Sequence, residues 1–488
     1  MLKKSISIFL LLAITVVMLF GDSLGVLRRR GIQNDEMDED ALILWYTDAS
    51  YAEYVRDAAV SYEKKYGVKV IPTEVSDVDY LEQIQTSSTD GIKAADLFML
   101  TGDQLEKAVL SGLAGQVRDP DKVLNSAFYT NASLRAVTYR DNMYGYPLSY
   151  ETAFVIYNKT LMKEIAKSAI LQGDPENTEG ITLVVPEENS GEEAPAEREL
   201  TEEEQLQVDA MAENILPTSV VGIMDFANQY SLPEGVEHYF LWDTEDVLYN
   251  YWFAGAYLNV GGENSDKSEE INLYNDQALY SLSVYQDFKN FFSMGDEELS
   301  YNEVIDGFFQ RKYVFTVVGT DIVAKVQKAK EEETFTDEYS VLPLSMLNST
   351  MNSKGLSVTT MVCVNGLGED RLEAEKFADF MTNEYAPNLY ARCEKMSAAR
   401  LQEYPYPEMK QIEDYYEHTV SLPKMVETTN YYILAEMCFS NIWDGEDVNA
   451  ELKSLAESVM RSVYGNEFTL ESIQTPEVSE NYNAQDEN

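Results

Sequence analysis

Few side chains in this sequence are suited to catalysis that uses histidine. Only two histidines occur in 488 residues, His238 and His418, and they lie in unrelated segments. A Ser-His-Asp or Cys-His nucleophile system would have to use one of them. The pattern H-E-x-x-H, the Walker phosphate loop and G-x-G-x-x-G after a strand do not occur. Both histidines are therefore better explained as residues of polar surface loops.

The cysteines and histidines are not spaced as metal ligands. Cys363, Cys393 and Cys438 never fall at ligand spacing with each other or with a histidine, which nearly excludes a zinc site. Three cysteines in a long chain make no disulfide framework, and the odd number leaves at least one thiol free. Cys363, in the apolar run TTMVCV, is most simply a buried hydrophobic residue. We expect neither a metal nor another cofactor.

Carboxylates are the remaining groups that could do chemistry, and they are abundant. The chain has 85 acidic and 36 basic residues and a net charge of −49. Such a charge repels a phosphate backbone, so nucleic acid is the least suitable partner. A solvated surface accounts for most of the charge. A carboxylate pair could also hydrolyse a glycosidic bond, but with so many acidic residues that pattern has almost no specificity.

Strands and helices alternate in the first part of the chain. This alternation predicts a mainly parallel sheet that is covered on both faces. Ligands bind at the carboxyl ends of the strands in such sheets, which indicates the loops TDAS after Tyr46 and TGDQ after Leu100. The strands are predicted over 42–47, 68–75 and 95–100, and the helices over 51–66, 80–88 and 103–112.

The later part of the chain contains further helices and two apolar strands. The aromatic-rich segment 246–262 predicts a helix that ends at a glycine pair, and 276–292 predicts an amphipathic helix. Segment 303–321 predicts a helix, a turn, a strand and a loop, and 355–365 predicts a second apolar strand. The last helix is predicted over 447–465, with its first residue, an aspartate, as a candidate cap.

Both ends and one internal segment differ in composition from the rest. Two lysines precede the apolar run Ile6–Phe20, so residues 1–30 are predicted to be a signal peptide or a signal anchor, without a lipid-attachment cysteine. In either case the bulk of the chain is expected to be exported. The acidic segment 173–204, rich in proline and glycine, is predicted to be a flexible insertion, and 468–488 a disordered acidic tail.

Five segments occur in an order that is typical of one protein family. They are LWYTDASYAEYVRDAAVSYEKKYGVKV, ADLFMLTGDQLEKAVLSGLAGQV, YGYPLSYETAFVIYNK, GFFQRKYVFTVVGTD and EAEKFADFMTNEYAPNLYARCEKMSAAR. In order and spacing they resemble the extracellular solute-binding proteins of ABC importers, of the carbohydrate type (family 1) that includes the maltodextrin binders. The resemblance covers most of the chain from Ala41 to about Asn466.

This resemblance implies an α/β fold of the two-lobed periplasmic-binding-protein kind (type II). Each lobe would be a sheet flanked by helices, and one ligand would be held in the cleft at the hinge. Lobe 1 is expected to comprise 41–150 and 360–402, and lobe 2 to comprise 151–359, which includes the insertion, and 403–467. The chain would cross between the lobes near Tyr150–Val155, Ser357–Val364 and Arg400–Tyr406, which places Glu151 at the floor of the cleft.

The chemistry of sugar recognition indicates which residues would line that cleft. Aromatic faces stack on the C–H faces of sugar rings, and carboxylates accept hydrogen bonds from hydroxyls. Trp45 and Trp252 could instead belong to the core, and Asp48, Asp103 and Asp321 could instead cap the helices that follow them. The expected ligand-binding residues are Trp45, Asp48, Asp103, Tyr150, Glu151, Trp252, Asp321, Tyr431 and Tyr432.

One position departs from the family pattern. Where the family often has a tryptophan shortly after a glycine, this chain has a threonine and Asp321 after Gly319. The loss of a stacking ring and the gain of a carboxylate weaken the assignment to oligosaccharides. An acidic cleft that contains Asp48, Asp103, Glu151 and Asp321 would suit an amino sugar or a polyamine-like cationic solute.

The resemblance implies a non-enzymatic, exported binding protein. It would capture a small polar solute, most simply a carbohydrate, at the extracellular face of the membrane or in the periplasm, and deliver it to the permease of an ABC importer. We expect it to act as a monomer. The alternatives are a binder of a cationic solute, a secreted carbohydrate-active enzyme that uses a carboxylate pair, and a receptor module with the same fold.

Overall fold

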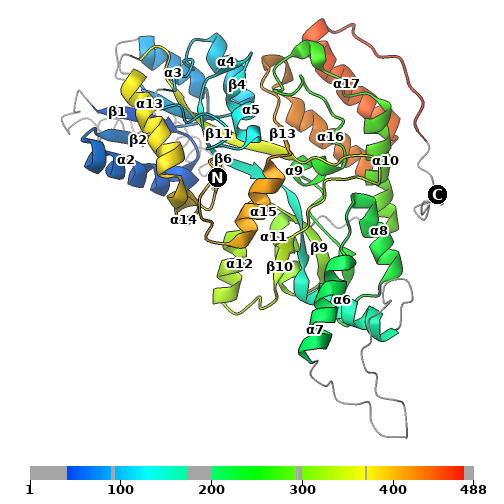
Figure 1. Ribbon diagram of the computed structural model, residues 1–488. Helices are drawn as coiled ribbons and strands as arrows, with labels where there is room; N and C mark the ends of the chain where they lie inside the picture. Colours follow the sequence, from blue (N-terminus) through cyan, green and yellow to red (C-terminus); the bar gives the residue numbers. More distant parts are fainter. Residues whose placement is uncertain are drawn as a thin grey trace, which may run out of the picture.

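The computed structural model describes residues 41–89, 94–119, 121–172, 201–292, 294, 299–368 and 371–476. The N-terminal apolar segment, residues 173–200 of the predicted insertion and residues 477–488 of the predicted tail lie outside this part of the chain. The described residues form two lobes, each built on one main β-sheet with helices around it (Figure 1). Among these residues no helix is both long and apolar enough to cross a membrane.

The first lobe contains a seven-stranded sheet in the order β12-β6-β11-β3-β1-β2, with β13 paired to β11. β1 is parallel to β2 and to β3, as the alternation of strands and helices predicts. β11 is antiparallel to β3 and to β6, so the expectation of a mainly parallel sheet is wrong for this half, where strands enter from the other lobe. The strands are β1 (Leu42–Tyr46), β2 (Val70–Glu74), β3 (Leu97–Thr101), β6 (Tyr146–Thr152), β11 (Leu356–Val364), β12 (Met396–Ser397) and β13 (Val420–Ser421).

Helices cover both faces of this sheet. Leu97 and Met99 of β3 pack into one apolar cluster, whereas Phe98 and Leu100 pack into another, because successive strand residues point to opposite faces. In Figure 1, α3 and α4 lie above the sheet and α2 and α14 below it. The helices of this lobe are α2 (Ala52–Tyr66), α3 (Tyr80–Thr89), α4 (Leu105–Leu110), α5 (Asn131–Val137), α13 (Arg371–Asp379) and α14 (Leu389–Cys393), and a small hairpin joins β4 (Thr138–Tyr139) to β5 (Asn142–Met143).

The second lobe contains a four-stranded sheet in the order β10-β7-β9-β8. Its pairs are antiparallel except β8 with β9. The strands are β7 (Phe154–Asn158), β8 (His238–Phe240), β9 (Tyr313–Val318) and β10 (Tyr339–Val341). The helices are α6 (Lys159–Gln172), α7 (Glu202–Asn214), α8 (Val220–Gln229), α9 (Val247–Asn250), α10 (Asp276–Phe291), α11 (Tyr301–Phe309), α12 (Ile322–Glu331), α15 (Pro407–Tyr416), α16 (Tyr431–Trp443) and α17 (Val448–Tyr464).

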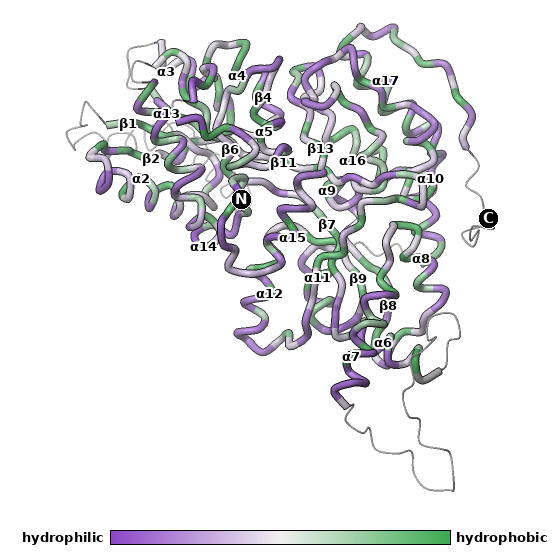
Figure 2. Tube along the Cα trace, viewed as in Figure 1, coloured by the Kyte–Doolittle hydropathy of each residue, from purple (hydrophilic) through white to green (hydrophobic). Residues whose placement is uncertain are grey.

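Aromatic side chains dominate the core of the second lobe. Trp242, Phe253 and Tyr285 are buried there together with Phe439 and Trp443. The Trp242 and Trp443 rings meet edge to face, with centroids 5.3 Å apart, the geometry that the ring quadrupole favours. Figure 2 shows the contrast with the exposed helix α7, which is largely hydrophilic. This core fixes α10 and α16 against each other and so supports the loops at the edge of the lobe.

The segment 246–262 is not the single helix that its composition predicts. Helix α9 spans four residues, and a 3-10 turn follows over Tyr251–Phe253. The hydroxyl of Ser353 donates to the backbone oxygen of Trp252 at 2.7 Å. In a continuing helix that oxygen would accept from the backbone N–H four residues later, so the tertiary contact takes an acceptor that the helix would need.

The chain passes between the two sheets beside Glu151. A single residue, Ala153, separates β6 of the first sheet from β7 of the second. The hydroxyl of Thr152 donates to the backbone oxygen of Leu356, at the start of β11, and β13 pairs with the same end of β11. Three segments that connect the lobes therefore run side by side, and we call Thr152–Phe154, Gly355–Ser357 and Thr419–Ser421 the crossover segments.

The ends of the two acidic segments are more ordered than their composition predicts. Helix α7 begins at Glu202, inside the predicted insertion, and Thr201 and Glu204 form a reciprocal capping box. In the predicted tail, Leu470 and Ile473 pack against the core of the second lobe, and Asn449 donates to the backbone oxygen of Ile473 at 2.9 Å. Residues 468–476 therefore belong to the folded lobe, because Leu470 and Ile473 pack on its core and the chain bonds to α17.

Candidate functional site

Glu151 lies at the end of β6, directly before the chain leaves the first lobe. Its carboxylate forms an ion pair with Lys395. The pairing of β12 with β6 explains this contact, because Met396 lies opposite Tyr150 and the preceding residue therefore reaches Glu151. Glu151 keeps 44% of its side chain exposed, so its carboxylate is held by the lysine and still open to a ligand.

Lys395 is the central charge of this side of the site. Its Nζ lies 4.0 Å from Asp48 Oδ2 and 5.9 Å from the centre of the Tyr51 ring. Burial opposes its charge, but the nearby carboxylates, Glu151 first, together raise the pKa of Lys395 above its ordinary value. The lysine therefore stays protonated and partly neutralises the two carboxylates beside it.

Asp48 and Asp103 also have structural functions in their own loops. Asp48 caps the short turn Ala49–Tyr51 and accepts a hydrogen bond from the N–H of Ser50 at 2.8 Å, so the alternative of a cap is confirmed for this residue. Asp103 accepts a hydrogen bond from the hydroxyl of Thr101 at 2.5 Å. Of the two, Asp48 is the one that the structure brings to the Glu151–Lys395 pair.

On the second lobe, two tyrosines form a stacked pair near the loop that follows β9. The rings of Tyr249 and Tyr301 have centroids 5.0 Å apart and an interplanar angle of 7°. The Tyr301 hydroxyl donates to Asp321 Oδ1 at 2.6 Å and accepts from the N–H of Gly319 at 2.9 Å. Asp321 stands directly before α12, at the N-cap position, but makes no side-chain cap bond; its side chain orients the tyrosine instead.

The two halves of the site lie beside the same crossover segment, because Val318 at the end of β9 pairs with Phe154, three residues after Glu151. Burial raises the pKa of Tyr249, and nearby carboxylates raise it further. These carboxylates include Asp321 from the second lobe and Glu151 from the first. Both charges therefore act on one tyrosine hydroxyl, and we define the candidate cleft site by the residues Asp48, Glu151, Tyr249, Tyr301, Asp321 and Lys395.

Three of the expected ligand-binding aromatic residues lie in the core. Tyr150 is fully buried and stacks on Tyr416. Trp252 is buried among the aromatic residues of the second lobe, and its ring N–H donates to the backbone oxygen of Tyr249 at 2.8 Å. Tyr431 is also buried, with its hydroxyl 2.7 Å from that of Tyr251.

The two remaining aromatic candidates are only partly buried. Trp45 packs against the apolar cluster on one face of the first sheet, and its backbone oxygen accepts from the hydroxyl of Tyr80 at 3.0 Å. The hydroxyl of Tyr432 donates to Asp246, which also caps α9. The described contacts tie Trp45 to its own lobe and Tyr432 to the helix that carries Tyr249.

Sequence reasoning missed three members of the candidate cleft site. Lys395 lies in the segment CEKMSAAR, where nothing in the local pattern distinguishes it from a surface lysine. Tyr249 and Tyr301 belong to two separate helical segments, and only the fold stacks their rings. The spacing of Tyr249 three residues before Trp252 gives no usable signal, because the segment is not one helix and Trp252 lies in the core.

Two hollows in the described part of the chain lie outside the candidate cleft site. One of about 810 Å³ is bordered by α6, α7, β10 and α15, and one of about 560 Å³ lies between Arg135 and the loop that follows α9. Lys354, His418 and Thr419 line both hollows, so these flank the crossover segments. None of the nine expected ligand-binding residues borders either one. Among the described residues, no group of three histidine, cysteine or acidic side chains is arranged to hold a metal ion.

Comparisons with known proteins agree with this architecture. Residues 57–397 match the family described as bacterial extracellular solute-binding protein. A galactooligosaccharide-binding protein of Bacillus subtilis (strain 168) is 31% identical over 125 residues, which make up 25% of this chain and 28% of the relative. The match thus spans little more than a quarter of that relative's length.

Solved structures of sugar-binding proteins share the fold. A cyclo/maltodextrin-binding protein complexed with maltotetraose has a TM-score of 0.64 at 16% identity, covering 88% of this chain and 99% of its own. An extracellular solute-binding protein from Staphylococcus aureus in complex with maltose has a TM-score of 0.65 at 15% identity, with the same coverage. The predicted two-lobed α/β fold is thereby confirmed.

Proposed function

The chain belongs to the bacterial extracellular solute-binding proteins, and we propose that it captures a neutral oligosaccharide and delivers it to the permease of an ABC importer. The observation that carries this proposal is that the stacked pair Tyr249–Tyr301 and the ion pair Glu151–Lys395 lie beside the same crossover segment. A tyrosine face binds the C–H face of a sugar ring. The ion pair offers an acceptor and a donor to the hydroxyls of the same ring.

The charge balance of the site supports a neutral ligand over a cationic one. Glu151 already has Lys395 as its counter-ion, and Lys325 lies 3.6 Å from Asp321. Asp321 also accepts the hydrogen bond from Tyr301. The carboxylates that suggested an amino sugar or a polyamine are therefore largely satisfied by the protein itself, and a cationic ligand would have to displace these partners.

The names of the related proteins support the same class of ligand. The curated relative is a galactooligosaccharide-binding protein, and the structural neighbours are bound to maltotetraose and maltose. We propose that the chain acts as a monomer without enzymatic activity. It is exported through its N-terminal segment and retained outside the cytoplasm. A glycosidase would need a carboxylic acid free to donate a proton, whereas Glu151 forms an ion pair with Lys395.

Calorimetric titration and thermal unfolding with a panel of solutes test the proposal. The panel contains maltotriose, a galactooligosaccharide, a glucosamine disaccharide and spermidine. A neutral sugar at 100 times its Kd is expected to stabilise the folded state by about 2.7 kcal/mol. Stabilisation by spermidine alone would replace the proposal by a binder of cationic solutes, and release of monosaccharides from the sugars would replace it by an enzyme.

The Tyr249→Ala variant ties the result to the candidate cleft site. We expect its affinity for the bound sugar to fall, because the stacking face is lost. Exposed Tyr464 on α17 provides the matched control, since Tyr464→Ala removes a ring that stacks on Phe468 and is not a member of the candidate cleft site. Equal affinity in both variants would place the sugar elsewhere on the molecule.

A further inference from the structure

Lys395 is delivered to the site by a strained turn. Helix α14 ends at Cys393 and is followed by Glu394, whose backbone is left-handed, with φ +57°. That conformation favours glycine, and other residues adopt it rarely. The turn brings Lys395 back toward β6, where its side chain is only 21% exposed. A long cationic side chain is thus directed inward, although an exposed position would avoid the cost of desolvating its charge.

The ammonium group of Lys395 lies near three side chains of the first lobe, which come from two segments, the end of β6 and the turn after β1. It pairs with Glu151 at the end of β6, lies 4.0 Å from Asp48 after β1, and lies over the ring of Tyr51. Only one of the two carboxylates would be needed to anchor a lysine. Because the lysine serves both, it changes the charge that this half of the cleft presents from −2 to −1.

We propose that Lys395 determines specificity, in that its charge makes the candidate cleft site select neutral sugars and reject sugars that carry an amine. This inference rests on the proposed function. Specific sites commonly combine attraction of the right ligand with repulsion of the wrong one. The ammonium of an amino sugar would approach Glu151, where Lys395 already occupies the favourable position and repels a second positive charge.

The Lys395→Met variant isolates the charge from the bulk of the side chain. Methionine keeps an unbranched apolar stem but leaves Glu151 and Asp48 without their shared counter-ion. Calorimetry at pH 6 compares a neutral disaccharide that binds the wild type with a glucosamine disaccharide. We expect the ratio of the two affinities to shift toward the amino sugar by about tenfold, and the gain to shrink at high salt.

The Glu151→Gln variant distinguishes specificity from a merely structural contact. It breaks the same ion pair but removes the opposite charge. If the pair only holds β12 against β6, the two variants weaken both ligands in the same proportion, and the proposal is overturned. If the proposal is correct, the affinity ratio moves toward the amino sugar in Lys395→Met and away from it in Glu151→Gln.

Two further arms make each outcome decisive. Lys395→Arg keeps the charge, so we expect it to retain the wild-type preference for the neutral sugar. If Lys395→Met does not fold, the Arg variant replaces it as the test. Loss of the preference in a folded Arg variant would contradict the proposal. If no sugar binds the wild type, the proposed function fails and this inference falls with it. If a sugar binds and the ratio does not change, only the inference about Lys395 fails.

Discussion

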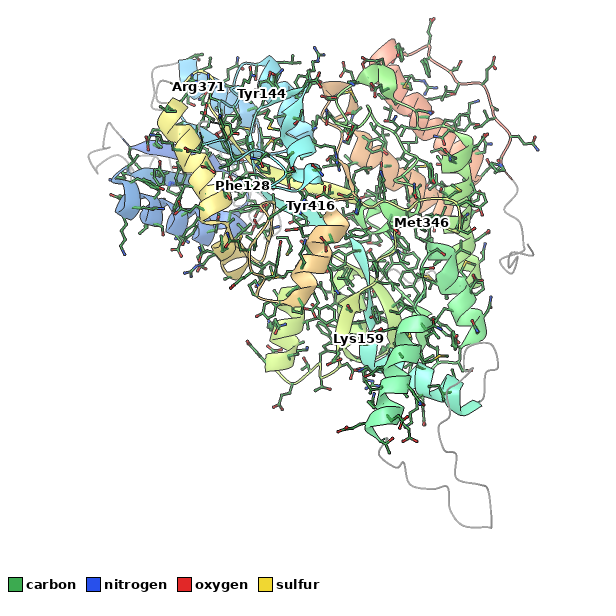
Figure 3. The ribbon with its side chains drawn as sticks, in the orientation of Figure 1. Phe128, Tyr144, Lys159, Met346, Arg371 and Tyr416 are labelled. Atoms are coloured by element: carbon green, nitrogen blue, oxygen red, sulfur yellow. The ribbon has the colours of Figure 1, made fainter. Side chains whose placement is uncertain are left out.

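The ring of Tyr150 lies flat on the ring of Tyr416, with centroids 3.6 Å apart and an interplanar angle of 1°. Tyr150 comes from β6. Tyr416 comes from the end of α15 and lies between the two lobes (Figure 3). The Tyr416 hydroxyl lies 2.7 Å from that of Thr359 on β11. The stack and this contact thus hold α15 against two strands beside the crossover segments. Tyr150 therefore packs beneath the site and does not line it.

The Tyr150 stack gives a prediction about stability. The hydroxyl of Tyr150 is buried and makes no hydrogen bond among the described residues. We expect Tyr150→Phe to change the free energy of unfolding by less than about 1 kcal/mol, because no bond is lost. Tyr150→Ala should lower it by about 3–5 kcal/mol, because it leaves a cavity. Urea unfolding measures both, and a loss of sugar affinity in Tyr150→Phe would contradict this assignment to the core.

A second prediction concerns the bond that orients the stacking face. Tyr301→Phe keeps the ring but removes the hydroxyl that bonds to Asp321 and to the N–H of Gly319. We expect sugar affinity to fall by about three- to tenfold, since a lost hydrogen bond to a charged group contributes about 1 kcal/mol or more. Calorimetry compares it with Tyr313→Phe in the same lobe, where the hydroxyl bonds only to the backbone of α11. An equal loss in both variants would indicate a general loosening of the lobe.

Local sequence predicted the elements around the site better than the site itself. Apolar periodicity predicted the strand β1 and the helix α2, and Gly67 predicted where the helix ends. In the structure Gly67 has φ +77°, the left-handed conformation that ends a helix. The crossing beside Glu151 followed from the family resemblance. These features depend on residues close together in the sequence, where propensity and pattern carry information.

The members of the site that were missed depend on pairing between distant segments. Lys395 and Glu151 are 244 positions apart, and only the register of β12 on β6 brings them together. The alternation of side chains along a strand already separates two of the predicted ligand-binding residues. Tyr150 and Glu151 are consecutive strand residues, so their side chains point to opposite faces. They were not both available to one ligand. Composition cannot separate core from cleft for aromatic residues, because large rings serve both.

A third prediction concerns Lys424, which is buried between the lobes. Its Nζ donates to the backbone oxygens of Arg135 and Thr138 in the first lobe and of Asn264 in the second, at 2.5–2.7 Å. Lys424→Met would remove this buried donor from all three oxygens, so we expect the free energy of unfolding to fall by about 3–5 kcal/mol. Lys354→Met, at an exposed position, should change it by less than about 0.5 kcal/mol.

Urea unfolding of both lysine variants checks this prediction. Near Lys424, the carboxylate of Asp266 is buried with one oxygen that has no hydrogen-bond partner among the described residues. Burial lowers the pKa of Lys424 to about 7, and the neighbouring carboxylate of Asp266 opposes this shift. The double variant Lys424→Met, Asp266→Asn should therefore be less destabilised than Lys424→Met alone. If Lys424→Met unfolds at the wild-type urea concentration, the lysine makes no net contribution to joining the lobes.

The last prediction concerns the pH dependence of stability at Asp379, at the end of α13. Burial, with help from the neighbouring acidic residues Asp121, Asp119 and Glu384, raises the pKa of Asp379 to about 6. In the unfolded chain the ordinary value of 3.8 applies. Between these two values the folded state binds more protons than the unfolded state, so this residue makes stability fall as pH rises from about 4 to 6.

Replacing Asp379 by asparagine removes this titration and keeps the size of the side chain. Below about pH 4 the protonated aspartate and the asparagine should be equivalent, whereas above pH 6 the wild type carries a poorly solvated charge. We therefore expect Asp379→Asn to become more stable than the wild type, relative to pH 4, by up to about 2–3 kcal/mol at pH 7. Urea unfolding at several pH values measures the difference, and Asp276→Asn at an exposed helix start controls for the loss of one negative charge. A difference that does not vary with pH would show that Asp379 is ionised at the same pH in the folded and unfolded chain.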